Sequence, residues 1–171
     1  MTSLAIALAL FGQTAPAPAP AATGWTFREN SDPAKPKSAS AVVHNAHGAR
    51  LIVRCDTAKV PIISVQFFPN PEVPAGDPRT VTLTINEAQA EITSWLFPGR
   101  GAYNGEAGEV FPIVSEIAPA KTVRVAFADG EREISEDFVG PGGDAMFRKV
   151  YGVCGLPYAM PVVTPEEPKK K

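Results

Sequence analysis

The sequence has few of the residues that bind metal ions tightly. Two cysteines and two histidines among 171 residues exclude most zinc arrangements, which are built from sets of such ligands. His44 and His47 are spaced H-x-x-H, but positions i and i+3 of a strand face opposite sides, and a turn lies between them. We therefore predict an exposed hairpin tip here, no metal site and no cofactor.

Catalytic motifs are also missing. The sequence contains no G-x-S-x-G, H-E-x-x-H or G-x-x-x-x-G-K pattern, the motifs of common hydrolases, zinc proteases and phosphate-binding loops. Acidic residues crowd one segment, but strand alternation at Glu131 and Glu133 places them on a polar outer face rather than in a site tuned by burial. The segment contains Glu131, Glu133, Glu136 and Asp137. We predict a protein that is not an enzyme and has no catalytic residues.

Neither a basic surplus nor a long apolar run is present. The formal net charge is −2, and an acidic balance argues against a nucleic-acid partner, because phosphate binding requires clustered lysine and arginine. The apolar run at residues 4–11 is far shorter than the roughly 20 residues of a membrane-spanning helix, and no later segment comes close. We therefore predict no transmembrane segment.

The two ends of the chain differ in composition from the rest. The apolar run at residues 4–11 is followed by alternating alanine and proline up to Ala22, which is the layout of a secretory signal peptide. We predict that residues 1–21 are removed by cleavage after Ala21, and that the protein is periplasmic or secreted; the alternative is an Ala/Pro-rich tail on a cytosolic protein. Residues 161–171 are rich in proline and lysine, which predicts a disordered tail. Residues 22–160 then form a single β-rich domain.

Cys55 and Cys154 are predicted to form a disulfide bond. An exported protein folds in an oxidising compartment, where an even number of cysteines normally pairs. The bond would close a loop of about 100 residues and so constrain the unfolded chain strongly. Two buried thiols are the alternative, whereas a redox pair is disfavoured because no C-x-x-C motif occurs.

Strand-like segments dominate the region between the two ends. Alternating apolar and polar residues, β-branched side chains and turn signals predict strands at residues 25–28, 39–44, 49–55, 60–68, 80–86, 91–97, 121–128 and 131–138. Apolar residues at helical spacing predict helices at residues 109–118 and 145–153, the second with Asp144 as its N-cap. The expected fold is mainly β: an antiparallel β-sandwich or partly open barrel of about eight short strands with two short helices.

The strongest hairpin signal is the dipeptide Asp129-Gly130. Asp-Gly is typical of a two-residue turn between antiparallel strands. With Asp129 and Gly130 as the two turn residues, Val125 pairs with Ile134 across the hairpin.

Segment 99–108 is the best candidate for a binding site. It contains four glycines and no aliphatic residue larger than alanine, which predicts a mobile loop. Arg100, Tyr103 and Asn104 lie in it, and arginine and tyrosine are typical of interaction hot spots. We predict that these three residues contact a partner; the alternative is a plain connection between a strand and a helix.

The order of features along the chain also resembles a known group of proteins. The features are Trp25, Ser31-Asp32-Pro33, Arg54-Cys55-Asp56, the alternating strand at 80–86 leading to Trp95, Glu136-Asp137-Phe138-Val139-Gly140, and a helix ending in Cys154. This order, over residues 25–155, resembles small exported bacterial β-domains typified by the type VI secretion-associated VasI-like proteins. The resemblance implies an envelope protein whose disulfide joins an early strand to the last helix, and it carries over no catalytic residues.

Together these features predict a non-enzymatic envelope protein. We expect a protein-interaction or accessory module whose partner is another envelope protein. The sequence leaves open the identity of this partner and the oligomeric state of the protein itself. One alternative is a small-ligand carrier, which requires a cavity lined by Trp95, Phe97 or Tyr103. The other alternative is an inhibitor of a lysozyme or a protease.

Overall fold

The computed structural model describes residues 23–30, 32–57, 59–88 and 91–160. The predicted signal peptide (residues 1–21) and the predicted disordered tail (residues 161–171) lie outside these ranges. Within the ranges, neither helix combines the length and the apolar character needed to cross a membrane.

The described residues form one antiparallel sheet of nine strands and two short helices. The strand order across the sheet is β1-β2-β3-β4-β7-β6-β5-β8-β9. The elements are β1 (Thr23–Glu29), β2 (Ser38–His44), β3 (Arg50–Asp56), β4 (Ile62–Phe68), β5 (Gly76–Ile85), β6 (Glu91–Gly99), β7 (Gly101–Asn104), α1 (Ala107–Ile117), β8 (Thr122–Asp129), β9 (Arg132–Val139) and α2 (Ala145–Val153). The mainly β, antiparallel prediction with two short helices is therefore confirmed.

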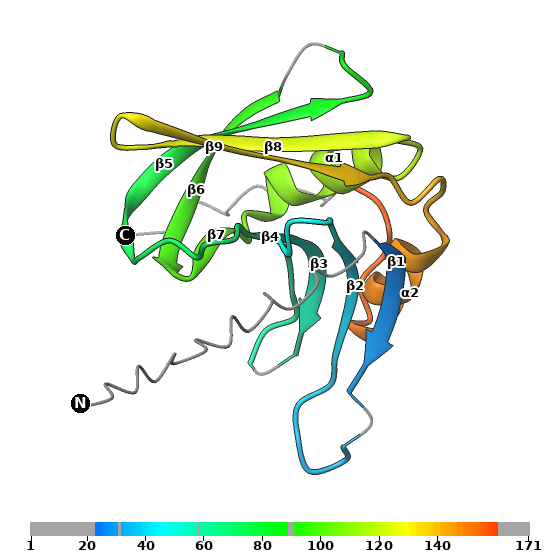
Figure 1. The fold of residues 1–171 in the computed structure, drawn as a ribbon. Helices are drawn as coiled ribbons and strands as arrows, with labels where there is room; N and C mark the ends of the chain where they lie inside the picture. The colour runs from blue at the N-terminus through cyan, green and yellow to red at the C-terminus, as the bar shows by residue number, and fades with distance from the viewer. Residues whose placement is uncertain (1–22, 31, 58, 89–90, 161–171) are drawn as a thin grey trace, which may run out of the picture.

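The sheet curls around one core without closing into a barrel (Figure 1). Its two edge strands approach each other: the Trp25 indole Nε1 on β1 donates a 2.8 Å hydrogen bond to the Val139 carbonyl on β9. A second link joins the β2–β3 turn to β9, where Asn45 Nδ2 donates to Glu136 Oε2 at 2.6 Å. The helices lie within the curl: α1 contacts β4, and α2 contacts β1, β2 and β3.

The core is built by the inward positions of the strands. Leu51, Val53 and Cys55 alternate along β3 and are fully buried, as strand periodicity predicts. Aromatic rings from both halves of the sheet meet edge to face: Phe67 contacts Phe127 at a centroid distance of 6.0 Å. Each large apolar side chain buried in this way stabilises the fold by about 1.5–3 kcal/mol.

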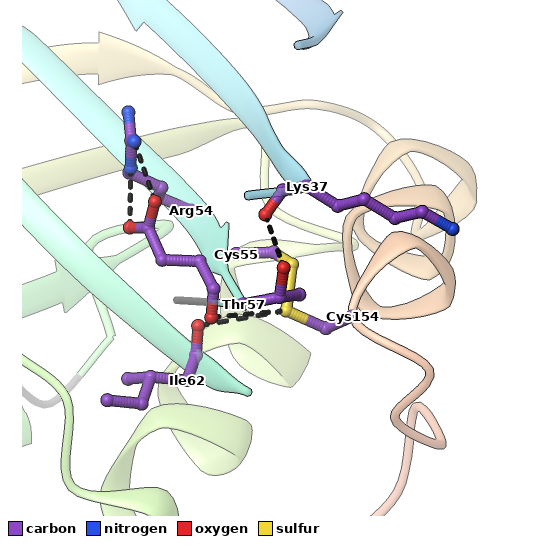
Figure 2. The surroundings of a disulfide bond; sticks show 7 residues. Lys37, Arg54, Cys55, Thr57, Ile62 and Cys154 are labelled. Carbon is purple, nitrogen blue, oxygen red and sulfur yellow. Dashed lines mark hydrogen bonds and ion pairs between the residues drawn. A yellow bond between two sulfur atoms is a disulfide. The ribbon is translucent and has the colours of Figure 1, made fainter. Parts of the chain in front are cut away.

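The disulfide Cys55–Cys154 is present and joins β3 to the end of α2 (Figure 2). The two Cα atoms are 5.9 Å apart, and the cysteines are separated by 99 positions in the sequence. Both residues are buried. The Cys154 Sγ also lies 3.8 Å from the Asp56 carbonyl oxygen; this is a packing contact, because an oxidised sulfur has no proton to donate.

The predicted β8–β9 register is wrong by two residues. Asp129 pairs with Arg132, so the turn residues are Gly130 and Glu131 rather than Asp129 and Gly130, and Phe127 rather than Val125 lies opposite Ile134. The turn that an Asp-Gly pair favours needs positive φ at both central residues, whereas the alternative hairpin turn needs it only at the first, where glycine is preferred. In this turn Gly130 alone has positive φ, 66°.

The mobile loop predicted for segment 99–108 is also wrong. Its middle forms β7, which pairs with β4 through Val65–Phe67 and with β6 from Leu96. Glycine at position 101 has a steric cause, because a Cβ there would collide with the carbonyl oxygen of Phe67. Helix α1 begins at Ala107, two residues earlier than predicted.

Removing the disulfide should destabilise the fold. The double variant Cys55→Ser/Cys154→Ser is expected to lose about 2–5 kcal/mol of unfolding free energy, because its unfolded chain is no longer cross-linked. Urea denaturation of the variant and of the oxidised wild type measures the loss. Wild type treated with reductant should match the variant, and an unchanged midpoint in both would contradict the cross-link.

Two glycine substitutions test the close packing of β7. Gly101→Ala should cost about 1–3 kcal/mol, because the added methyl group forces β7 away from β4. Gly108→Ala is the matched control: it lies in the first turn of α1 with open space around its Cα, and alanine is the better helix former by up to about 1 kcal/mol. Thermal unfolding should therefore shift down for the first variant and stay level or rise for the second.

Candidate functional site: the groove at the end of β7

The sheet divides where β7 ends. Strand β7 has four residues, and its pairing with β4 stops at Asn104 opposite Val65. Beyond that point, in the described part of the chain, residues 62–64 of β4 pair with β3 alone, and residues 91–95 of β6 pair with β5 alone. Two strand edges therefore face the space that a longer β7 would have filled.

A groove of about 420 Å³ occupies this space. Its apolar lining comes from Ile62 of β4, Leu96 of β6 and Tyr103 of β7, with Ser94 beside them. Ile62 is 44% exposed and Leu96 is 53% exposed. Large aliphatic side chains thus lie open to solvent on the outer face of the sheet.

The charge along the groove is negative. Among the lining residues, those that carry charge are Glu106 and Glu109, at the start of α1. The Glu109 carboxylate accepts a 2.6 Å hydrogen bond from Asn104 Nδ2, whereas Glu106 is exposed. The described lining therefore presents carboxylates and no basic group.

A second, mostly apolar pocket of about 240 Å³ adjoins the groove. It shares Ile62 and Gly105 with the groove and lies between the start of β4, α1 and the segment that follows α2. Phe111 and Tyr151 form its aromatic wall. Burial raises the pKa of Tyr151, and Tyr158 acts in the same direction, so the Tyr151 hydroxyl keeps its proton at neutral pH.

The three residues predicted to bind a partner do not form one cluster. Arg100 lies at the opposite end of β7 from the groove, where its Nη2 pairs with Glu72 Oε1 at 2.7 Å; this pair lowers the pKa of Glu72. Asn104 is buried, and its Oδ1 accepts a 2.9 Å hydrogen bond from the Glu106 backbone N–H. Tyr103 lines the groove with its ring over Gly105, and Asn104 lines it next to Tyr103. That any of the three binds a partner stays a prediction.

Sequence reasoning missed the groove residues Ile62 and Leu96. Alternation along β6 places Trp95 and Phe97 in the core, so Leu96 between them had to face outward. A large aliphatic residue at an outward position is therefore the signal in the sequence that identifies Leu96 as a surface residue.

The acidic residues at positions 131–137 differ in their exposure to solvent. Glu131, Glu133 and Asp137 are exposed, as predicted, but the Glu136 side chain is only 11% exposed. Glu136 Oε2 lies 3.0 Å from His47 Nδ1, so the hairpin-tip histidine contacts β9. Within the described ranges no three potential metal ligands of the His, Cys, Asp and Glu types gather.

Comparison with known proteins finds no matching family model, no matching curated protein and no matching solved structure. The candidate site therefore rests on the geometry described above.

The pair Glu91 on β6 and Glu116 on α1 predicts a pH dependence. Burial raises the pKa of Glu91, and both the charge of Glu116 and their hydrogen bond add to the effect. Between the usual pKa of 4.5 and the raised pKa, Glu91 holds a proton in the folded state that it has released in the unfolded chain. The free energy of unfolding therefore falls as pH rises through this range. Glu91→Gln should remove this loss and melt at a higher temperature at pH 7.

At a pH below the ordinary glutamate range, Glu91→Gln and wild type should converge, because Glu91 is then protonated in both states. Glu131→Gln, on the exposed β8–β9 turn, is the matched control and should leave the melting curve unchanged. Equal melting temperatures for Glu91→Gln and wild type at pH 7 would show that Glu91 is not held in a costly charged state.

Proposed function

We propose that this protein is an exported, non-enzymatic envelope protein that acts as an interaction or accessory module. In this proposal the groove at the end of β7 receives a segment of a partner protein. The exposed pair Ile62 and Leu96 is the observation that carries the proposal. Exposed apolar side chains that gather around a hollow are characteristic of interaction sites.

The disulfide supports a periplasmic or secreted location. Cys55 and Cys154 are buried and oxidised in the folded protein, and such bonds persist in oxidising compartments rather than in a reducing cytosol. The resemblance to VasI-like proteins predicts the same location and stays a hypothesis.

The size of the smaller pocket favours a partner side chain over a free ligand. Pockets for small molecules measure roughly 300–1,000 Å³. The groove, at about 420 Å³, lies within that range, whereas the smaller pocket, at about 240 Å³, lies below it. Of the three aromatic residues expected to line a carrier's cavity, Trp95 and Phe97 are 0% and 2% exposed in the core, whereas Tyr103 lines the groove. A single apolar side chain of a bound protein suits the smaller pocket, as anchor residues do at interfaces.

Affinity capture from envelope fractions tests the proposal. Leu96→Arg should lose the partner that the wild type retains, because the substitution places a bulky charged group in the apolar groove. The matched control is Val139→Arg, since Val139 is 47% exposed but lies on edge strand β9. Retention of the same partner by Leu96→Arg, or its loss with both variants, would contradict a role for the groove. Disulfide formation in each variant verifies that it has folded.

A further inference from the structure

We propose that the groove binds its partner by strand addition: an extended segment, with alternating apolar residues and a basic residue, pairs with the free edge of β6. This inference rests on the proposed function and specifies the chemistry of the partner. Main-chain hydrogen bonds would supply much of the affinity, and pockets for alternate side chains would supply specificity, as in other complexes formed by β-augmentation.

Beyond Glu91, the free edge of β6 lacks the charged groups that protect the outer edges of the sheet. Strand edges are templates for pairing unless charge, proline or a covering group blocks them. On β9, Glu133 and Asp137 are exposed, and the Val139 carbonyl is already bonded to Trp25. On β1, the residues Arg28 and Glu29 are exposed and charged.

By contrast, residues 92–95 of β6 carry no charge and include two β-branched side chains. Ile92 is 67% exposed, and this stretch pairs with β5 alone in the described chain. The groove separates Ser94 of this stretch from Glu109 of α1. Space for an added strand therefore exists directly beside the unpaired edge.

The side-chain requirements follow from the groove lining. Ile62 and Leu96 flank the space, so residues of the added strand that face outward with them are expected to be apolar. Glu106 and Glu109 supply the charge of the lining at the α1 end, so a lysine or arginine is expected near that end. Charge complementarity of this kind steers association and fixes orientation.

A labelled peptide tests the inference directly. The probe is a capped peptide of alternating leucine and lysine, about seven residues long to match a typical strand, and binding is measured by fluorescence anisotropy. The oxidised protein should bind it, and replacing lysine by glutamate should weaken binding at least about tenfold. N-methylation of alternate backbone amides should weaken binding by a similar factor, because it removes main-chain donors.

Protein variants locate the contact. Glu106→Lys should weaken binding of the leucine–lysine peptide, whereas Glu131→Lys, an identical charge change on the β8–β9 turn, should leave it unchanged. Hydrogen exchange at residues 91–95 should slow when the peptide is bound, with no slowing at residues 131–135.

The outcomes separate this inference from the proposed function. If partner capture depends on Leu96 but the N-methylated peptide binds as well as the unmodified one, strand addition is wrong and the interaction module stands. Absence of binding up to about 1 mM peptide overturns the inference. If the protein self-associates and Leu96→Arg abolishes this, the groove binds a second copy of the chain. If truncation after Met160 tightens peptide binding, the groove binds residues 161–171. Either result overturns the choice of a separate partner.

Discussion

The hydrogen bonds of Asn104 determine where this sheet divides. Asn104 accepts from the Glu106 N–H and donates to the Glu109 carboxylate, which turns the chain out of β7 and into α1 after four strand residues. Since β7 is the only described connection between β4 and β6, its early end leaves an edge on each of them. The groove and its open apolar side chains follow from this one turn.

The curled sheet keeps its shape through links between segments far apart in the sequence. The disulfide fixes α2 against β3, and the edge-to-face contact of Phe147 with Trp25 fixes the same helix against β1. Trp25 then bonds to Val139 at the other edge of the sheet. One chain of contacts thus runs from the covalent bond to the two sheet edges and holds the curl without a closed barrel.

Patterns that are local in sequence predicted most of the fold. Alternation placed Leu51, Val53 and Cys55 on the core face, and an even number of cysteines in a chain expected to be exported predicted the Cys55–Cys154 bond. The prediction failed where a contact with a distant segment decides the structure. Gly101 was predicted to lie in a loop because the segment around it is rich in glycine. In the structure it lies in a strand, where only glycine fits because the backbone of Phe67 on β4 approaches closely. The candidate site was predicted only in part: Tyr103 faces the groove, but its other walls come from β4, β6 and α1, which only the sheet order brings together.

The position of the disulfide also determines what a single proteolytic cut does to the molecule. Cys55 and Cys154 enclose the connections from β3 through to α2. A protease that cuts any one of these connections yields two fragments that remain covalently attached. Cleavage there does not by itself release a piece of the molecule.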